Sequence, residues 1–366
     1  MNFWVAMKRE PASKRITLNV LIMMKLFRKW WLLLFVYSMS GLVQAQSPEP
    51  LRQAPAPLYR DPIYDGAADP TLIWNKAEKT WWMLYTCRRA NVPSYDVSAY
   101  HGNRIGIASS DTHGQSWVFR GYLDLEFERG MNTFWAPDVV YEKGIYHMFV
   151  VYIRGVPNHW GSREQIVHFT SQNLWDWKHE GPLTLSSDRV IDATIIKKPD
   201  GKFRMWYKDD ARGGITMMSE SADLYSWETA REPVIGGKAH EGPKVFAFKG
   251  SYWMLTDEWQ GLRVYRSDDL ERWDKQGLIL DKPSQRADDH PSGAHADVVV
   301  FDDKAYVIYF THPGRESHFK TKPDPDGSLF YTNHRTAIQA APLQLVNGTL
   351  VADRNKPFDF WLPDMP

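Results

Sequence analysis

Residues 135–152 read WAPDVVYEKGIYHMFVVY, and this stretch predicts two antiparallel strands joined by a tight turn. The first strand opens at an acidic residue, Asp138, and continues as a short apolar run. Glu142-Lys143-Gly144 supplies the turn, because glycine adopts a positive φ without steric cost. The second strand alternates aromatic and aliphatic side chains, which is typical of a half-buried sheet. A third strand and a final turn to Trp177 complete a unit of about four strands.

The same unit recurs five times along the chain. Its acidic first residues lie between about 50 and 70 residues apart, and they are Asp69, Asp138, Asp192, Glu241 and Asp297. A period of this length with about four short strands per unit is typical of β-propeller blades. The sequence therefore predicts an all-β fold, a five-bladed β-propeller. A generic β-sandwich is the alternative, but it does not explain five acidic strand starts in phase.

The connections between the predicted strands fit this fold. Residues 221–227 and 267–273 share the pattern Ser-x-Asp-Leu-x-x-Trp and predict hairpins between the third and fourth strands of two blades. Two insertions, residues 88–104 and 315–329, are predicted to be loops. Long loops in compact domains often carry function, so we expect these two near the functional site.

The N-terminal region predicts a secretory signal rather than part of the fold. A basic stretch at residues 25–29 precedes the apolar run of residues 30–37, and small residues at 41–45 supply a cleavage site. We assign residues 1–45 to this signal, with Met24 as an alternative start. Residues 46–366 are then expected to form a single catalytic domain without a membrane span, in the periplasm or outside the cell.

Composition excludes several classes of protein. The chain has 366 residues, with 44 Lys and Arg against 44 Asp and Glu, so its net charge gives no basic footprint for nucleic acid. The single cysteine, Cys87, cannot form an intramolecular disulfide, and no Cys/His spacing resembles a zinc site. No cofactor is required by these patterns, and the oligomeric state stays open. The 17 Trp fit either a β-rich core or platforms for stacking sugars.

The acidic strand starts point to a reaction. The first strand of each propeller blade lines the central axis, so the five acids are expected to converge at one rim, where burial and like charges raise their pKa. Cleavage of a glycosidic bond needs one carboxylate that activates water or attacks the sugar, and one carboxyl that protonates the leaving oxygen. A third acid can keep the second one protonated. The alternative is a purely structural role, in which each acid caps a turn.

Five motifs make the chain from about Tyr59 onward resemble glycoside hydrolase family 43 and its five-bladed relatives, which include family 117. These motifs are Ala68-Asp69-Pro70, Trp135-Ala136-Pro137-Asp138-Val139, Val190-Ile191-Asp192-Ala193, His240-Glu241-Gly242-Pro243 and His295-Ala296-Asp297-Val298. Each motif is weak alone, but five in order on successive blades are specific. The resemblance implies an inverting glycosidase acting on oligosaccharides or polysaccharides, with a carbohydrate as its partner.

The resemblance also implies a role for individual residues. Asp69 would be the general base and Glu241 the general acid. Asp192 would orient the acid and raise its pKa, although Ala193 replaces the proline that is usual in the family. His295 resembles an axial histidine that lies beneath the sugar and contacts a calcium ion or its waters, so a structural calcium is one expectation. The residues expected to bind substrate are Arg88, Trp135, Asp138, His240, His295 and Arg315.

Other readings remain open at this point. In family 117, which includes anhydro-galactosidases, a histidine is the general acid, and His240, His295 and His312 keep that option. A non-catalytic carbohydrate-binding propeller would not need Asp69, Asp192 and Glu241 together. A mannoside phosphorylase would need a basic phosphate pocket.

The basic residues expected near the open face favour an acidic or anhydro sugar, unless they form ordinary salt bridges. These residues are Arg88, Arg89, Arg154, Lys208, Arg263 and Arg315. The two insertions favour exo action on short chains.

Overall fold

The computed structural model describes residues 52–94, 96–317, 320–321 and 330–366. The predicted signal segment lies outside these residues. Among the residues described, five antiparallel sheets have four strands each, and each sheet follows the order of the chain. The sheets are the five blades of a β-propeller, which confirms the predicted fold class. No helix in the described part of the chain is long and apolar enough to cross a membrane.

The strands of each blade are as follows. Blade 1 contains β1 (Ala67–Asn75), β2 (Thr80–Cys87), β3 (Arg104–Ser110) and β4 (Val118–Tyr122), and blade 2 contains β5 (Thr133–Glu142), β6 (Ile145–Ile153), β7 (Gln165–Ser171) and β8 (Lys178–Pro182). Blade 3 contains β9 (Val190–Lys197), β10 (Phe203–Asp209), β11 (Ile215–Ser221) and β12 (Glu228–Thr229), and blade 4 contains β13 (Glu241–Phe248), β14 (Ser251–Asp257), β15 (Leu262–Ser267) and β16 (Asp274–Ile279). Blade 5 contains β17 (Ala294–Phe301), β18 (Lys304–Thr311), β21 (Ala337–Val346) and β22 (Thr349–Val351).

The two insertions are more ordered than the loops that the sequence predicts. The first contains the 3-10 helix η1 (Asp96–Tyr100). The second begins with β19 (Arg315–Ser317), which pairs with β20 (Lys320–Thr321), and the short helix α2 (Phe330–His334) follows it. A further 3-10 turn, η2 (Asp210–Arg212), follows β10.

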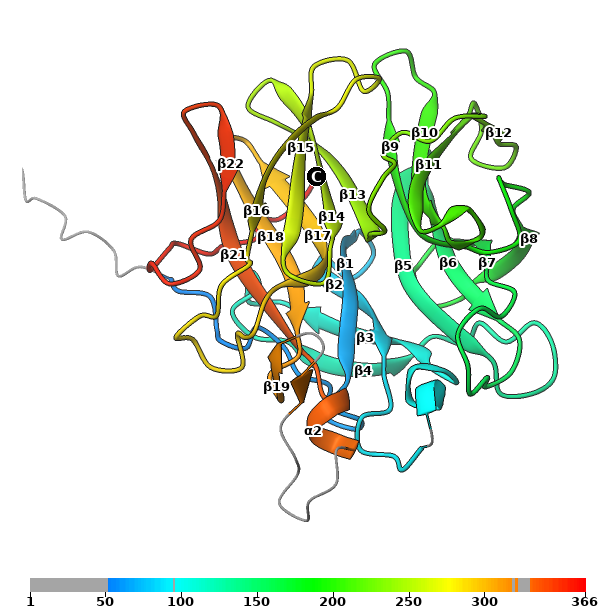
Figure 1. Cartoon of the computed structure of the whole chain (residues 1–366), viewed down its shortest axis with the longest axis horizontal. Coiled ribbons are helices and arrows are strands. Elements are labelled where there is room, and N and C mark those ends of the chain that lie inside the picture. Colours follow the sequence, from blue (N-terminus) through cyan, green and yellow to red (C-terminus); the bar gives the residue numbers. More distant parts are fainter. Residues whose placement is uncertain (1–51, 95, 318–319, 322–329) are drawn as a thin grey trace, which may run out of the picture. The chain divides into compact units, whose positions relative to one another are not determined.

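The first strand of each blade contacts the first strand of the next blade, and the series closes into a ring. The contacts run from β1 to β5, β9, β13 and β17, and from β17 back to β1 (Figure 1). The segment before β1 supports this closure, because Tyr59 exchanges backbone hydrogen bonds of 3.2 and 2.9 Å with Ile338 in β21. The N-terminal side of the domain is therefore fastened to the last blade.

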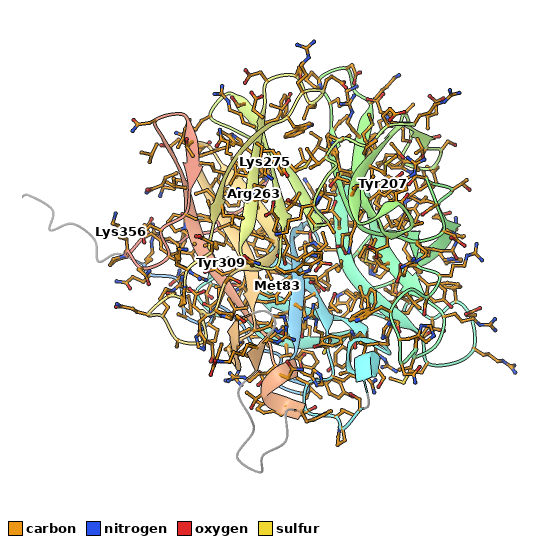
Figure 2. All side chains as sticks on the ribbon, viewed as in Figure 1. Met83, Tyr207, Arg263, Lys275, Tyr309 and Lys356 are labelled. Carbon is orange, nitrogen blue, oxygen red and sulfur yellow. The ribbon has the colours of Figure 1, made fainter. Side chains whose placement is uncertain are left out.

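Six apolar clusters among the described residues hold the ring together, with two at the interface between blades 2 and 3 and one at each of the other interfaces. Aromatic side chains supply much of this core, and Trp82, Trp206 and Trp253 are completely buried. Met83, Tyr207 and Tyr309 lie inside the blades, whereas Lys275 and Lys356 are exposed (Figure 2). The alternating aromatic strands of the repeat thus face neighbouring blades, as β-strand periodicity requires.

Each inner strand carries a β-bulge near its start, and the bulge fixes which residues are equivalent. Two residues on the inner strand oppose one residue on the second strand at each bulge. The first bulge residues of the five blades are Asp69, Ala136, Asp192, Gly242 and His295. The φ angles of the first four are 47°, 45°, 59° and 56°, so the left-handed backbone is shared even where the residue type differs.

The prediction that all five acids occupy equivalent positions is therefore wrong. Asp69 and Asp192 are bulge residues, but Glu241 lies one residue before its bulge. Asp138 and Asp297 each lie two residues after the first bulge residue of their strand, which is the position that Lys244 occupies in blade 4. Spacing within a sequence motif cannot show a one-residue or two-residue shift, because the bulge is a feature of pairing between strands.

Asp138, Lys244 and Asp297 form one buried ionic group, which we call the axial ion group. The Lys244 ammonium lies 2.8 Å from a carboxylate oxygen of each aspartate. The second oxygen of Asp138 accepts the backbone N–H of Ile195 at 3.0 Å, and that of Asp297 accepts the N–H of Leu72 at 2.7 Å. Side chains from blades 2, 4 and 5 are thereby linked to the backbones of blades 3 and 1.

Replacing the ammonium at the centre of the axial ion group should destabilise the whole ring. Lys244→Met leaves two carboxylates buried without a counter-ion, and we expect the free energy of unfolding to fall by about 3–5 kcal/mol. Chemical denaturation at pH 7 measures this loss. The exposed Lys249, which is 3.8 Å from Asp303, provides the control, and Lys249→Met should change stability by less than about 0.5 kcal/mol. A loss below about 1 kcal/mol for Lys244→Met would contradict a central role for the group.

Candidate active site

A cavity of about 550 Å³ lies above the axial ion group, where the inner strands begin. Its lining includes seven residues at the bulges or one residue before them, which are Asp69, Trp135, Ile191, Asp192, Glu241, Ala294 and His295. The size is that of small-molecule sites in general. The three acids predicted to be catalytic thus lie together in one cavity, and they come from blades 1, 3 and 4.

Asp69 lies between two basic side chains. A carboxylate oxygen is 3.5 Å from Nδ1 of His295 and 3.8 Å from a guanidinium nitrogen of Arg88. The side chain is largely buried, and its backbone holds a positive φ of 47° at the bulge. Left-handed backbone at an aspartate is uncommon, and the bulge aims this carboxyl toward the cavity that it lines.

Asp192 occupies the equivalent bulge in blade 3. One oxygen accepts the backbone N–H of Gly242 at 3.0 Å and lies 4.0 Å from Nδ1 of His295. Burial raises the pKa of Asp192 to about 6; His295 opposes the increase, and Glu241 and Asp69 add to it. This carboxyl is therefore partly protonated near neutral pH.

Glu241 faces a buried ammonium. Its Oε2 lies 3.2 Å from Nζ of Lys208, and the same ammonium is 3.0 Å from Asp210. Burial raises the pKa of Glu241, but Lys208 and a hydrogen bond from Trp259 outweigh burial, so the net shift is downward. In the free protein, Glu241 is consequently held in its carboxylate form.

Asp257 is a cavity residue that the sequence analysis did not select. It is the cross-strand partner of Glu241, and its two oxygens accept the backbone N–H groups of Trp259 at 2.6 Å and His295 at 3.1 Å. Burial raises its pKa to about 7, with Glu241 as the next largest cause. The sequence gives no motif for it, because Asp257 ends a second strand and reaches Glu241 only through strand pairing.

The imidazole of His295 lies among these acids. Burial opposes its protonation, but the nearby carboxyls of Asp192, Asp69, Glu241 and Asp257 outweigh burial and raise the pKa of the imidazole. Its ring explains the glycine at position 242. A Cβ there would lie 2.7 Å from the imidazole, and the φ of 56° at this position also favours glycine.

Three residues expected to bind substrate line the cavity on the side of Asp69: Arg88, Trp135 and Arg315. The Arg88 guanidinium lies over the rings of Tyr100 and Phe310, at 5.5 and 4.7 Å from their centroids. Arg315 donates to the hydroxyl of Tyr100 at 2.8 Å, and the indole N–H of Trp135 donates to the Tyr100 carbonyl at 2.6 Å. The first insertion thus brings η1 to the site, as expected of a functional loop.

Two other residues expected to bind substrate do not line the cavity. Asp138 lies below it in the axial ion group. The ring of His240 is buried, with Nε2 2.7 Å from the Thr216 hydroxyl and Nδ1 2.9 Å from the Lys238 carbonyl. Burial also lowers the pKa of His240. Its position one residue before Glu241 turns the side chain away from the acids, as alternation along a strand predicts.

The expected cluster of basic residues separates into three groups. Arg89 donates to the backbone carbonyls of His101 at 3.1 Å and Ser98 at 2.8 Å and does not line the cavity. Arg154 pairs with Glu128 at 3.4 Å and Arg263 with Glu258 at 2.9 Å, so both form ordinary ion pairs outside the cavity lining. Arg88, Lys208 and Arg315 line the cavity. Further lining residues that sequence reasoning did not assign to the site are Glu164, Arg189 and Asp210.

The calcium ion expected near His295 stays a prediction. Calcium takes six to eight oxygen ligands in proteins. Among the residues that the structure describes, no group of three or more His, Cys, Asp or Glu side chains is placed to hold a metal ion. Nδ1 of His295 instead faces Asp69 and Asp192. No step of the chemistry below uses a metal.

A ring of five four-stranded blades with buried carboxyls at the start of its inner strands defines the class of this protein, a β-propeller glycoside hydrolase. The chain belongs to the family-43-related glycosyl hydrolases: their family model, described as a probable glycosyl hydrolase domain, matches residues 53–301. A search of the curated proteins finds no match. A relation to family 117 is not shown by these findings.

Solved structures of family-43 enzymes have a similar fold. A thermostable family-43 glycoside hydrolase is 18% identical with a TM-score of 0.56, and the match covers 84% of this chain and 98% of that one. A β-xylosidase/α-arabinofuranosidase from a compost microbial metagenome is 15% identical with a TM-score of 0.60, covering 82% and 98%. A β-1,3-galactosidase is 14% identical with a TM-score of 0.58, covering 84% and 99%. At these identities the likeness concerns the fold alone.

The raised pKa of Asp257 predicts a pH-dependent effect of removing its charge. The folded pKa of about 7 lies above the ordinary value of 3.8, so the folded state binds more protons in this window and loses stability as the pH rises through it. Asp257→Asn abolishes this loss. We compare the melting temperature of the variant with that of the wild type at each pH. The variant should gain on the wild type by about 2 °C or more on going from pH 5 to pH 8.

Thermal unfolding of both proteins at the two pH values measures this difference. Asp268→Asn is the control, because the Asp268 side chain is 75% exposed. An equal offset for Asp257→Asn at pH 5 and pH 8 would show that Asp257 is ionised throughout.

Proposed function

We propose that this glycosidase is inverting and exo-acting, with Asp69 as the general base and Glu241 as the general acid. The observation that carries the proposal is the placement of these two carboxyls on inner strands of different blades at one cavity, with Asp192 and His295 beside them. An inverting enzyme needs two carboxyls far enough apart to admit a water molecule between the base and the sugar. The relation to family 43 supports the same pair.

The surroundings of Asp69 suit a base. A base has to act as a carboxylate. Beside this carboxyl lie the imidazole of His295, whose pKa is raised by the surrounding acids, and the guanidinium of Arg88. Both also keep the carboxylate in place. A water molecule beside Asp69 would lose a proton to it while attacking the anomeric carbon from the side opposite to the leaving group.

Glu241 needs a proton before it can act, although Lys208 favours its carboxylate form in the free protein. The neighbouring carboxyls are the store of protons in this proposal, because the pKa is raised to about 6 for Asp192 and to about 7 for Asp257. A sugar that fills the cavity removes water from around Glu241 and raises the cost of its charge. The proton then resides on Glu241 and passes to the leaving oxygen.

The shape of the site supports action at chain ends. The cavity of about 550 Å³ is bounded on the Asp69 side by η1, through Val97 and Tyr100, and by the start of the second insertion, through His312 and Arg315. A chain that continued in both directions would have to cross these residues. The substrate is a carbohydrate, and the β-1,3-galactosidase and the β-xylosidase among the similar structures make neutral oligosaccharides the first to test.

Two further elements of the proposal concern the setting of the enzyme. Export by the signal predicted in residues 1–45 would place it in the periplasm or outside the cell, where it would take part in polysaccharide degradation. The acid–base chemistry above uses side chains alone and requires no cofactor. The alternative of a non-catalytic binding propeller gives no reason for Asp69, Asp192 and Glu241 to share one cavity, and the next experiment separates it from an enzyme.

Charge-removing substitutions at the two proposed catalytic carboxyls should abolish most of the activity. Asp69→Asn removes the base and Glu241→Gln removes the acid, and each should lower kcat by about 10²–10⁴-fold without loss of folding. Activity is measured on a panel of xylo-, β-1,3-galacto- and 1,5-α-arabino-oligosaccharides, and folding by circular dichroism. Asp303→Asn, at an exposed carboxylate that is 79% accessible, is the control. Near-wild-type turnover in either variant would overturn the assignment.

A further inference from the structure

A second group of ionisable side chains lines the same cavity, on the side of blades 2 and 3. Glu164 precedes β7 and Arg189 precedes β9, and the two segments pair in parallel. The Glu164 N–H donates to the carbonyl of Asp188 at 3.1 Å, and the Val190 N–H donates to the carbonyl of Glu164 at 3.0 Å. The backbone therefore holds both side chains in fixed positions, as a binding site requires.

One polar atom of each side chain in this pair lacks a hydrogen bond within the described residues. The Glu164 side chain is only 4% exposed, and its Oε2 lies 3.7 Å from Nε of Arg189. Neither atom has a hydrogen-bond partner among the described residues. Burial raises the pKa of Glu164 to about 7, and the charge of Asp210 adds to the increase. A buried carboxylate oxygen without a hydrogen bond destabilises the fold, so Oε2 of Glu164 and Nε of Arg189 are available to a partner from outside the chain.

An exposed aromatic residue lines the same cavity, one residue before Gly161, where an added Cβ would lie 3.4 Å from a guanidinium nitrogen of Arg189. Trp160 lines the cavity and is 59% exposed, although large apolar side chains are usually buried. Its ring contacts Tyr100, His101 and Trp135, with centroids 5.6, 5.5 and 6.2 Å away. These contacts hold the indole in place and leave much of its surface open. A flat apolar surface that shares one cavity with a carboxyl and a guanidinium matches a sugar ring, which has apolar faces and hydroxyls at its edge.

The pair adjoins the proposed acid rather than the proposed base. Both Asp210 and Lys208 contribute to the electrostatic field at Glu164, and Lys208 contacts Glu241 at 3.2 Å. Arg88, by contrast, contacts Asp69. Because the general acid protonates the leaving oxygen, the sugar that departs lies on the Glu241 side. The carboxyls of Glu164 and Asp210 would repel a second anion there, which favours a neutral sugar.

We propose that Trp160, Glu164 and Arg189 form a distal subsite that binds the neutral leaving-group sugar through two adjacent hydroxyls. One hydroxyl donates to Glu164, its neighbour accepts from Arg189, and the sugar ring stacks on Trp160. The leaving-group role rests on the proposed hydrolysis, but binding at the distal subsite does not. The distal subsite would make the enzyme select for sugars that follow the scissile bond.

Binding without turnover gives the first test. In the Asp69→Asn background, calorimetry measures the Kd for xylobiose, β-1,3-galactobiose and 1,5-α-arabinobiose. For the disaccharide that binds most tightly, Trp160→Ala and Glu164→Gln should each raise Kd at least about tenfold. A tenfold change corresponds to a loss of about 1.4 kcal/mol of binding free energy. Arg163→Met is the control, since Arg163 is 67% exposed and does not line the cavity. An unchanged Kd in both subsite variants, or no binding of any disaccharide to the parent protein, would overturn the distal subsite.

Turnover gives the second test and separates the two proposals. Each disaccharide is paired with the glycosyl fluoride of its non-reducing sugar, whose leaving group is too small to reach the distal subsite. The ratio of kcat/KM for disaccharide to kcat/KM for fluoride should fall at least about tenfold in Trp160→Ala and Glu164→Gln. An unchanged ratio would refute the leaving-group role. A wild-type protein that binds disaccharides through Trp160 and Glu164 but cleaves nothing would refute the hydrolytic proposal and retain the distal subsite.

Discussion

The axial ion group is the constraint on which the site depends. Lys244 holds Asp138 and Asp297 at 2.8 Å each, and these aspartates bind backbone N–H groups of blades 3 and 1. The five blades meet largely through apolar side chains, and these directional contacts help to set their inner strands in register at the axis. A buried ion pair adds little net stability over an apolar core, so its main consequence here is the fixed arrangement of the strand starts above it.

Next to the axial ion group, the bulges give the inner strands the same backbone conformation, but the residues at the bulge positions have different roles. The same left-handed position holds Asp69 in blade 1, Asp192 in blade 3 and a glycine in blade 4, where the ring of His295 needs the space. The charges are arranged so that the cationic side chains of Lys208 and His295 separate the acids. Different carboxyls therefore differ in pKa within one small volume, which is the condition for assigning one as base and another as acid.

The fold and part of the site could be predicted from the sequence, because both are carried by local repeats. The strand alternation, turns and acidic strand starts gave five blades, and Asp69, Asp192, Glu241 and His295 do line one cavity. The rest depends on pairing between strands. A bulge places Asp138 below the cavity, and cross-strand pairing brings Asp257 to Glu241. Glu164 enters the site because the segment before β7, within blade 2, pairs in parallel with the segment before β9 of blade 3, which no motif records.

The central claim is that Asp69 activates water while Glu241 protonates the leaving oxygen, so that hydrolysis occurs in a single displacement. The most direct measurement is proton NMR of the sugar first released from an active oligosaccharide, recorded before the anomers equilibrate. Our account predicts that the new reducing end has the anomeric configuration opposite to that of the cleaved bond. Release of the sugar with its original configuration would mean that a carboxyl attacks the sugar directly, and it would contradict the account.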